Sequence, residues 1–113
     1  MPSSPKIPRR YQLVVCADNF SISVQASEYA YCSPRNNTGP YKDVELGYPS
    51  QPDDLIAKWA EDKTRPTETI YGWVAVDVVR DLIAKHGGAV RGTVPPGVVM
   101  LMAPEAERKE GEE

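Results

Sequence analysis

Residues 11–26 read YQLVVCADNFSISVQA, and this stretch decides the fold class. Its two halves, 11–16 and 20–26, are rich in the Val, Ile, Phe and Tyr side chains that favour β-strands. The second half alternates apolar and polar residues, which is typical of a strand with one buried face. Its apolar members are Phe20, Ile22, Val24 and Ala26. Residues 17–19 read Ala-Asp-Asn, and Asp and Asn tolerate the left-handed backbone of a tight turn. The stretch therefore predicts an antiparallel β-hairpin.

Further segments downstream have strand character. They are a short run at 29–32, YKDVELGY at 41–48, TIYGWV at 69–74 and VVMLM at 98–102. The second of these alternates Val44 and Leu46 with acidic neighbours, so we expect a strand with one wet face that ends at Pro49. The last is apolar throughout and is predicted to be the strand that closes the domain.

Two segments are predicted as helices. The first, SQPDDLIAKWAEDK, begins at Ser50, a residue type that caps helix N-termini, and its apolar residues fall at helical spacing. Asp53 and Asp54 would complement the positive end of its dipole. The second covers residues 75–86, with one apolar face, and Gly87 follows it as the glycine expected just after a helix.

The length of the chain sets its domain organisation. A chain of 113 residues is the size of one domain. We expect a single α+β domain over residues 11–103, a mostly antiparallel sheet with two helices packed on one face. Residues 1–10, with three prolines, are expected to be a flexible arm. Residues 104–113 are expected to be an acidic, disordered tail.

The distribution of charge excludes several function classes. The net charge of −3 is carried by residues 105–113, which hold five Glu against one Arg and one Lys, so the rest of the chain is neutral. A neutral body argues against nucleic-acid binding, which needs a basic surface. No apolar run approaches the roughly 20 residues of a membrane helix, and the N-terminus lacks the apolar segment of a secretory signal. We therefore expect a cytoplasmic protein with no nucleic-acid or membrane partner.

Catalytic and metal-binding groups are few. His86 is the single histidine, and its place at the end of a predicted helix favours a structural role. Cys16 and Cys32 are expected to be free thiols in a reducing compartment, although paired strands would allow a disulfide. The one hydrolase alternative is a Cys32 thiol activated by Arg35, with His86 as its base. Phosphate-binding loops, nucleotide-binding glycine motifs and nucleophile elbows are absent. We expect no enzyme, no metal and no cofactor.

The loop YCSPRNNTGPY, residues 31–41, holds most of the binding chemistry. An arginine forks onto phosphate or carboxylate, asparagines add further donors, and aromatic rings offer flat faces to a base. The candidate ligand-binding residues are Arg35, Asn36, Asn37, Tyr31, Tyr41, Trp73 and Arg91. The structural alternative is an ordinary polar turn with half-buried strand tyrosines, and an exposed loop charge at Arg91.

Three segments give the chain a resemblance to a known family. They are YCSPR followed by GPY within residues 31–41, the AED…PT…YG segment of residues 60–72, and HGG at 86–88. Over about residues 22–88 the chain resembles the anti-Thoeris sponge proteins, a family of small phage proteins. The N-terminal arm and everything after Gly92 do not contribute to the resemblance.

The resemblance implies a protein that captures cyclic nucleotide signals without cleaving them. The signals would be cyclic ADP-ribose isomers made by a bacterial TIR-domain immune enzyme, and some members hold small cyclic oligonucleotides at a second type of site. It also implies homo-oligomers with pockets between protomers. No family ligand contact is carried over to a position here, so the candidate residues rest on their chemistry. The alternative is a phage protein that inhibits a host defence complex by protein contact, which the neutral body and acidic tail fit equally well.

Overall fold

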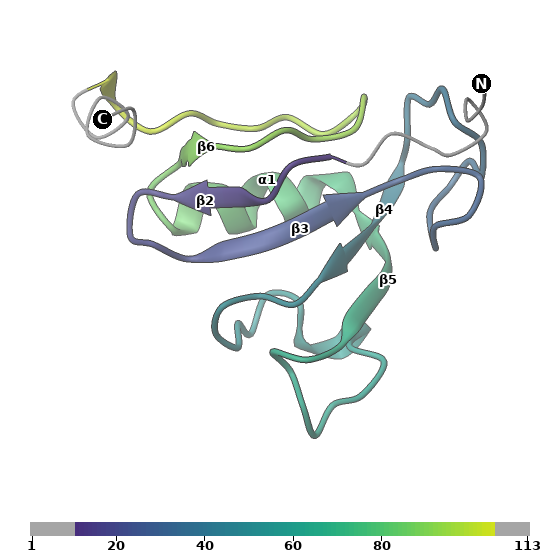
Figure 1. Cartoon of the computed structure of the whole chain (residues 1–113), viewed down its shortest axis with the longest axis horizontal. Helices are drawn as coiled ribbons and strands as arrows, with labels where there is room; N and C mark the ends of the chain where they lie inside the picture. The colour runs from purple at the N-terminus through teal and green to yellow at the C-terminus, as the bar shows by residue number, and fades with distance from the viewer. Residues whose placement is uncertain (1–10, 106–113) are drawn as a thin grey trace, which may run out of the picture.

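The computed structural model describes residues 11–105. Its elements, in chain order, are β2 (Val14–Cys16), β3 (Ser21–Gln25), β4 (Asp43–Gly47), the 3-10 turn η1 (Ala57–Trp59), β5 (Ile70–Ala75), α1 (Val76–Lys85) and β6 (Ala89–Arg91). The strands form a 5-stranded sheet in the order β5-β4-β3-β2-β6, with antiparallel neighbours throughout. The helix α1 lies across one face of this sheet, behind β2 and β3 in Figure 1. The expected α+β class is confirmed.

The hairpin predicted at residues 11–26 is present as β2 and β3. Val14 pairs with Ile22, and the turn closes with a hydrogen bond from the Cys16 amide to the Phe20 carbonyl. Asn19 takes the left-handed backbone expected of the turn, with φ 77°. The alternating apolar residues face the core: Ile22 and Val24 of β3 are fully buried, as is Phe20 just before the strand.

The helix at residues 75–86 and two strands that precede it in the chain were also predicted correctly. The expected strands 41–48 and 69–74 correspond to β4 and β5, and the expected helix 75–86 corresponds to α1. The buried face of α1 consists of Val79, Leu82 and Ile83. The chain leaves the helix through Gly87, whose φ of 94° belongs to the left-handed region that favours glycine.

The second predicted helix is wrong. Residues 50–63 form turns and the short η1, so residues 11–105 contain one α-helix rather than two. The capping residues are engaged elsewhere. The Ser50 hydroxyl accepts a hydrogen bond from the Ser21 amide, and the Asp53 carboxylate accepts one from the Leu55 amide while it also binds the end of α1. Tertiary contacts thus override the local helix signal.

Two of the predicted strands are also absent, and one strand was missed. Residues 29–31 form bends and residue 32 is irregular. The Ser27 hydroxyl holds this shape by accepting the amides of Tyr29 and Ala30. Residues 98–102 make an isolated parallel bridge, Met102 with Ala89, instead of a strand. The missed strand is β6, which lies within residues 88–97, a segment rich in Gly and Pro. It pairs with β2 through only two residue pairs and is too short for a periodic signal.

The core lies between the sheet and α1. Its largest fully buried side chains include Tyr71, Phe20, Ile22, Leu46, Ile56, Leu82 and Ile83. Cys16 and Cys32 are both buried and unpaired, so the expected free thiols are confirmed. No helix in residues 11–105 is long and apolar enough to cross a membrane. The expected arm at residues 1–10 and most of the expected tail, residues 106–113, lie outside the described residues.

Candidate ligand-binding site

The loop of residues 31–41 is folded against itself by its own polar side chains. The Asn36 side-chain oxygen accepts hydrogen bonds from the amides of Thr38 and Gly39, and the Asn37 side-chain oxygen accepts one from the Glu28 amide. The Tyr41 hydroxyl donates to the Asn36 carbonyl at 2.7 Å. The two asparagines therefore serve mainly to hold the loop in shape.

The Arg35 side chain is positioned by the backbone that precedes it. Its Nε donates to the Ala30 carbonyl at 3.1 Å and its Nη2 to the Tyr29 carbonyl at 3.4 Å. The guanidinium lies 5.6 Å from the centre of the Tyr31 ring, within the range of a cation–π contact. A guanidinium has five N–H donors, and two of them are used here. Within residues 11–105 the remaining donors make no hydrogen bond, which leaves them to an anionic ligand.

Tyr31 and Trp73 form a stacked pair beside Arg35. Their ring centres are 4.9 Å apart with 19° between the planes. Two hydrogen bonds fix the pair: the Trp73 amide donates to the Tyr31 carbonyl at 3.0 Å, and the Tyr31 amide donates to the Glu45 carboxylate at 2.9 Å. A Cβ added at Gly72 would lie 3.2 Å from the Tyr31 Cβ, so the small residue there permits this close approach.

Trp73 is held in a backbone conformation that bulky residues rarely adopt. Its φ is 53°. The strand register shifts between Val44 and Leu46, so that Gly72 and Trp73 of β5 together oppose the single residue between them on β4. This is a β-bulge, a feature that redirects side chains and occurs often next to binding sites. A left-handed backbone at a non-glycine residue costs of order 1–3 kcal/mol, and here it places an indole that is 48% exposed.

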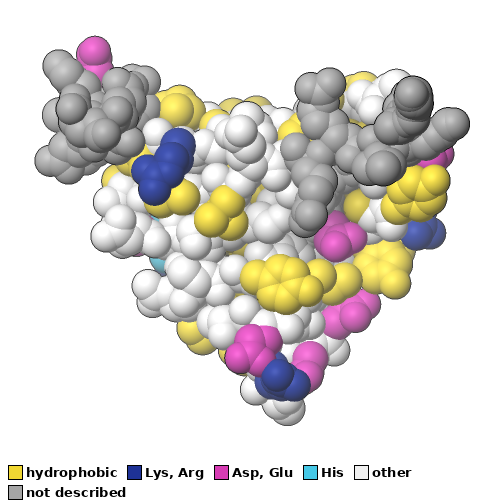
Figure 2. Space-filling model, viewed as in Figure 1, with side chains coloured by type: hydrophobic (Ala, Val, Ile, Leu, Met, Phe, Trp, Pro, Cys, Tyr) yellow, Lys and Arg dark blue, Asp and Glu magenta, His cyan; other side chains and the backbone are white. Residues whose placement is uncertain are grey.

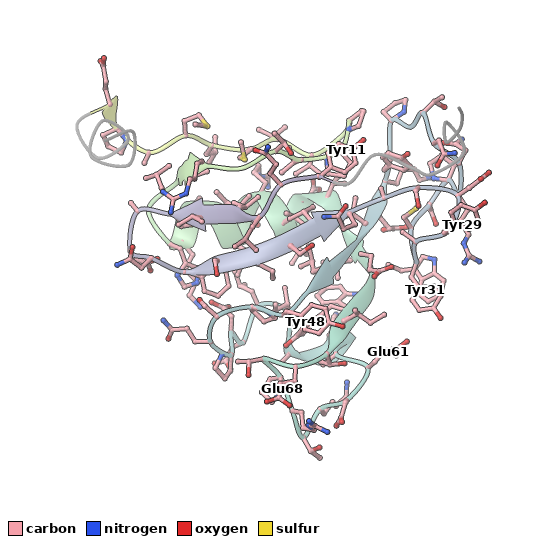
Figure 3. All side chains as sticks on the ribbon, in the orientation of Figure 1. Tyr11, Tyr29, Tyr31, Tyr48, Glu61 and Glu68 are labelled. Carbon is pink, nitrogen blue, oxygen red and sulfur yellow. The ribbon has the colours of Figure 1, made fainter. Side chains whose placement is uncertain are left out.

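Together these residues form one surface feature, the Arg35–Tyr31–Trp73 cluster. Tyr29 lies next to it with 65% of its surface exposed, and Figure 3 shows Tyr29 and Tyr31 at the same edge of the molecule. In Figure 2 apolar side chains at that edge are interspersed with basic and acidic ones. The cluster combines a cation with stacked aromatic rings on an open surface, which suits a ligand that is both flat and anionic.

Tyr41 and Arg91 do not contribute to this cluster. Tyr41 is only 3% exposed, so its ring packs in the core and offers no face to a ligand. Arg91 belongs to β6, at the opposite edge of the sheet from β5 and Trp73. The structure therefore brings together Arg35, Tyr31 and Trp73, uses the asparagines as loop supports, and leaves Arg91 distant within one protomer.

Sequence reasoning missed two contributors to this surface. Glu45 was read only as a polar residue on the wet face of its strand, whereas its carboxylate anchors the Tyr31 amide. Tyr29 was placed in a short strand, whereas it lies in a bend and is exposed. The β-bulge places Glu45 opposite Gly72 and Trp73, whereas the Ser27 hydroxyl holds the bend at Tyr29. Nothing in the local sequence pattern marks either feature.

A second polar cluster joins three segments far apart in the sequence. The His86 ring lies with Nδ1 2.7 Å from Asp18 Oδ2 and with Nε2 2.7 Å from Asp53 Oδ2. Lys85 Nζ lies 3.0 Å from the other oxygen of Asp53. The structural role expected for His86 fits this arrangement, but the meeting of these residues could not be foreseen, because their sequence positions share no local pattern.

The carboxylates of this cluster give a pH prediction. Burial would raise the pKa of Asp53, but hydrogen bonds from the Leu55 amide, His86 and Lys85 outweigh it and hold the pKa below its usual 3.8. For Asp18, burial likewise acts to raise the pKa, and hydrogen bonds from His86 and the Phe20 amide lower it overall. A lowered pKa adds stability above the unfolded-state value and loses it as the pH falls.

We therefore expect the free energy of unfolding to decline as the pH drops below about 4, the usual range of Asp carboxyls. Urea unfolding at a series of pH values, followed by tryptophan fluorescence, measures it. Asp18→Asn should show a weaker decline over the same range. An equally steep decline in the variant would contradict the role given to this carboxylate.

The hydrolase alternative has little support in the geometry. Cys32 is 2% exposed, and its thiol donates to the Ser27 carbonyl. Both ring nitrogens of His86 face aspartates. No group of three or more His, Cys, Asp or Glu that would hold a metal ion occurs among the residues described.

Comparisons of the chain with protein-family models, with curated proteins and with solved structures found no match.

Proposed function

We propose that this protein binds a small nucleotide-bearing molecule and holds it without cleaving it. The observation that carries the proposal is the Arg35–Tyr31–Trp73 cluster, in which an exposed guanidinium lies beside a stacked aromatic pair. The strained backbone of Trp73 supports it, because strain of this kind persists mostly where it serves a site.

The anionic part of such a ligand would bind Arg35. The guanidinium is already oriented by the carbonyls of Tyr29 and Ala30, so little conformational entropy remains to be lost on binding. The N–H groups that have no hydrogen bond within the described residues suit the paired oxygens of a phosphate. Hydrogen bonds of this kind are the stronger, charge-assisted ones.

The flat part of the ligand would stack on the aromatic pair. Trp73 is 48% exposed and Tyr31 is half-buried. The Tyr31 backbone is fixed by Glu45 and Trp73. Stacking of a base on an aromatic side chain contributes about 1–3 kcal/mol and requires no catalytic group. The occupied nitrogens of His86 and the buried Cys32 agree with capture rather than turnover.

The resemblance to anti-Thoeris sponge proteins supplies the ligand class and the setting of this proposal. The ligands would be cyclic ADP-ribose isomers, or small cyclic oligonucleotides, in the cytoplasm of an infected bacterium. The cluster is open on the surface of one protomer and Arg91 is distant from it, so we propose a homo-oligomer in which a second protomer completes the pocket. Arg91 would then be the cation that the second protomer contributes.

The test is isothermal titration calorimetry with the full chain and a panel of cyclic ADP-ribose isomers and cyclic dinucleotides. Arg35→Ala should weaken binding by about 10–100-fold, because a charge-assisted hydrogen bond contributes about 1.5–3 kcal/mol. Trp73→Ala should weaken it by about tenfold or more through lost stacking. The matched control is Arg80→Ala, an exposed arginine of α1, which should bind as the native protein does.

Three outcomes decide the proposal. Mass spectrometry of ligand released by denaturation should return it intact, whereas cleaved ligand would make the protein an enzyme. Equal affinity in Arg35→Ala and the native protein would remove the cluster from the site. An unchanged affinity in Arg91→Ala, or a monomer in light scattering with ligand bound, would refute the shared pocket.

The exposure of Tyr29 favours a second candidate function. Tyr, Trp and Arg are the residue types that dominate protein–protein interfaces. Tyr29 is 65% exposed, and its carbonyl accepts a hydrogen bond from Arg35. The second candidate is an inhibitor that contacts a host defence protein through the same surface. Failure of every nucleotide to bind, together with recovery of one stoichiometric host protein that Tyr29→Ala no longer retains, would favour it.

A further inference from the structure

The His86 ring is enclosed by charged and apolar groups from several elements. It stacks on Phe20 with ring centres 3.9 Å apart and 7° between the planes, and its side chain is 13% exposed. Each of its nitrogens lies 2.7 Å from a carboxylate oxygen. An ionised carboxylate only accepts hydrogen bonds, so both nitrogens must carry protons. The arrangement therefore holds a charged imidazolium, which the C-terminal end of α1 also favours.

The charges of the titratable groups around the ring cancel only when the ring is an imidazolium. Asp18 comes from the turn between β2 and β3, Asp53 from the segment before η1, and Lys85 from α1. Two neutral groups lie next to the carboxylates. Burial and then the charge of Asp18 raise the pKa of Cys16 to about 11, and burial and then Asp53 raise the pKa of Tyr71. With the imidazolium, the two negative charges meet two positive ones.

If the ring loses a proton, it can donate a hydrogen bond to only one of the two aspartates. A neutral imidazole has one N–H, so one carboxylate would face a nitrogen lone pair. The Asp53 side chain is 3% exposed, and the Asp18 side chain is 49% exposed. An unpaired buried carboxylate is far more costly than one that can turn into water. Asp53 should therefore keep its hydrogen bond from the ring N–H, and the Asp18 side chain should move away from the ring.

The Asp18 carboxylate also supports the backbone of the hairpin turn. Its other oxygen accepts the Phe20 amide at 2.9 Å. The Ala17 amide donates to the Gly88 carbonyl and the Asp18 amide to the His86 carbonyl, so the turn lies directly against the end of α1. Figure 1 shows this turn and the C-terminal end of α1 at the same end of the molecule. Departure of the carboxylate removes the acceptor of the Phe20 amide and loosens the turn locally.

We propose that the charge of His86 controls the contact between the β2–β3 turn and the end of α1, a contact that we call the latch. The latch is closed when the ring is charged. It opens when the ring is neutral, because Asp18 then moves outward. Histidine is the side chain that most often changes charge near physiological pH. The latch lies away from the Arg35–Tyr31–Trp73 cluster and does not depend on the function proposed for that cluster.

The test is nuclear magnetic resonance of the full chain as a function of pH. Nitrogen shifts of the His86 ring report its charge and tautomer, and amide exchange, expressed as protection factors, reports the backbone. As the ring loses its proton, the Nε2–H tautomer should appear and the protection of the Phe20 amide should fall about tenfold, as expected for one lost charge-assisted hydrogen bond. The Leu55 amide, which donates to Asp53 at 2.9 Å, should keep its protection.

The contrary results are equally specific. An Nδ1–H tautomer, or loss of protection at Leu55 instead of Phe20, would show that Asp53 rather than Asp18 is released. Constant protection at Phe20 across the titration of the ring would show that there is no latch. Asp18→Asn, an exposed position, should make the Phe20 protection independent of the charge of His86. The measurement on the native chain decides the proposal without any variant.

Discussion

Replacement of Asp53 with alanine is expected to lower the free energy of unfolding by about 3 kcal/mol at neutral pH, because removal of one partner leaves buried charge without compensation. Asp53 is the centre of a small network: its side chain is 3% exposed and contacts His86, Lys85 and the Leu55 amide. This expected loss is at the lower end of the losses seen when a buried ion pair is broken, because Lys85 is half exposed and can turn to water. Urea unfolding followed by tryptophan fluorescence measures it.

The adjacent aspartate gives a matched control. Asp54 is exposed and has no hydrogen bond or ion pair within residues 11–105. Asp54→Ala should therefore stay within about 0.5 kcal/mol of the native protein. A loss at position 54 as large as that at position 53 would mean that net charge or local propensity, rather than the contacts of Asp53, sets the stability.

The second large effect is expected at Gly97. A Cβ there would lie 2.4 Å from the Tyr41 carbonyl oxygen and 2.8 Å from the Tyr41 amide nitrogen, and φ is 105°. Gly97→Ala combines backbone strain of about 1–3 kcal/mol with overpacking of similar size. We expect a loss of about 3 kcal/mol in the free energy of unfolding. Because Tyr41 also holds the loop of residues 31–41 through Asn36, ligand binding should weaken as well.

Gly47 provides the comparison. It lies in β4, and an added Cβ would make ordinary contacts of 3.8 Å with Ile70 and 3.9 Å with Ser23. Gly47→Ala should change the free energy of unfolding by no more than about 1 kcal/mol. Thermal unfolding of the two variants side by side tests the pair, and equal losses would refute the steric argument for Gly97.

The elements that were predicted correctly share a physical property. The β2–β3 hairpin and α1 are amphipathic with a clean period of two or 3.6 residues, and their buried faces are Phe20, Ile22 and Val24 on one side and Val79 and Leu82 on the other. Burial of such a face stabilises the same element that the local pattern favours. Local and tertiary preferences agree there, so the sequence pattern was sufficient.

The helix that was predicted wrongly lies in a segment whose polar side chains form tertiary contacts. Residues 50–63 carry a helix signal, but Ser50 binds the backbone of Ser21 and Asp53 binds the end of α1. Those contacts lie 29 and 33 residues away along the chain. Only a folded chain brings such partners together, so a sequence window of helix length contains no sign of them.

The candidate site, like the fold, could be predicted only in part. The sequence by itself identified the residue types of the loop, an arginine and tyrosines among turn-forming residues, because composition shows which groups bind anions and flat rings. The tertiary structure decided which of them meet: the β-bulge at Trp73 brings its indole onto Tyr31, Tyr41 is buried in the core, and Arg91 lies at the far edge of the sheet. The reason is that strand register and order, which no local pattern encodes, set the distances between side chains.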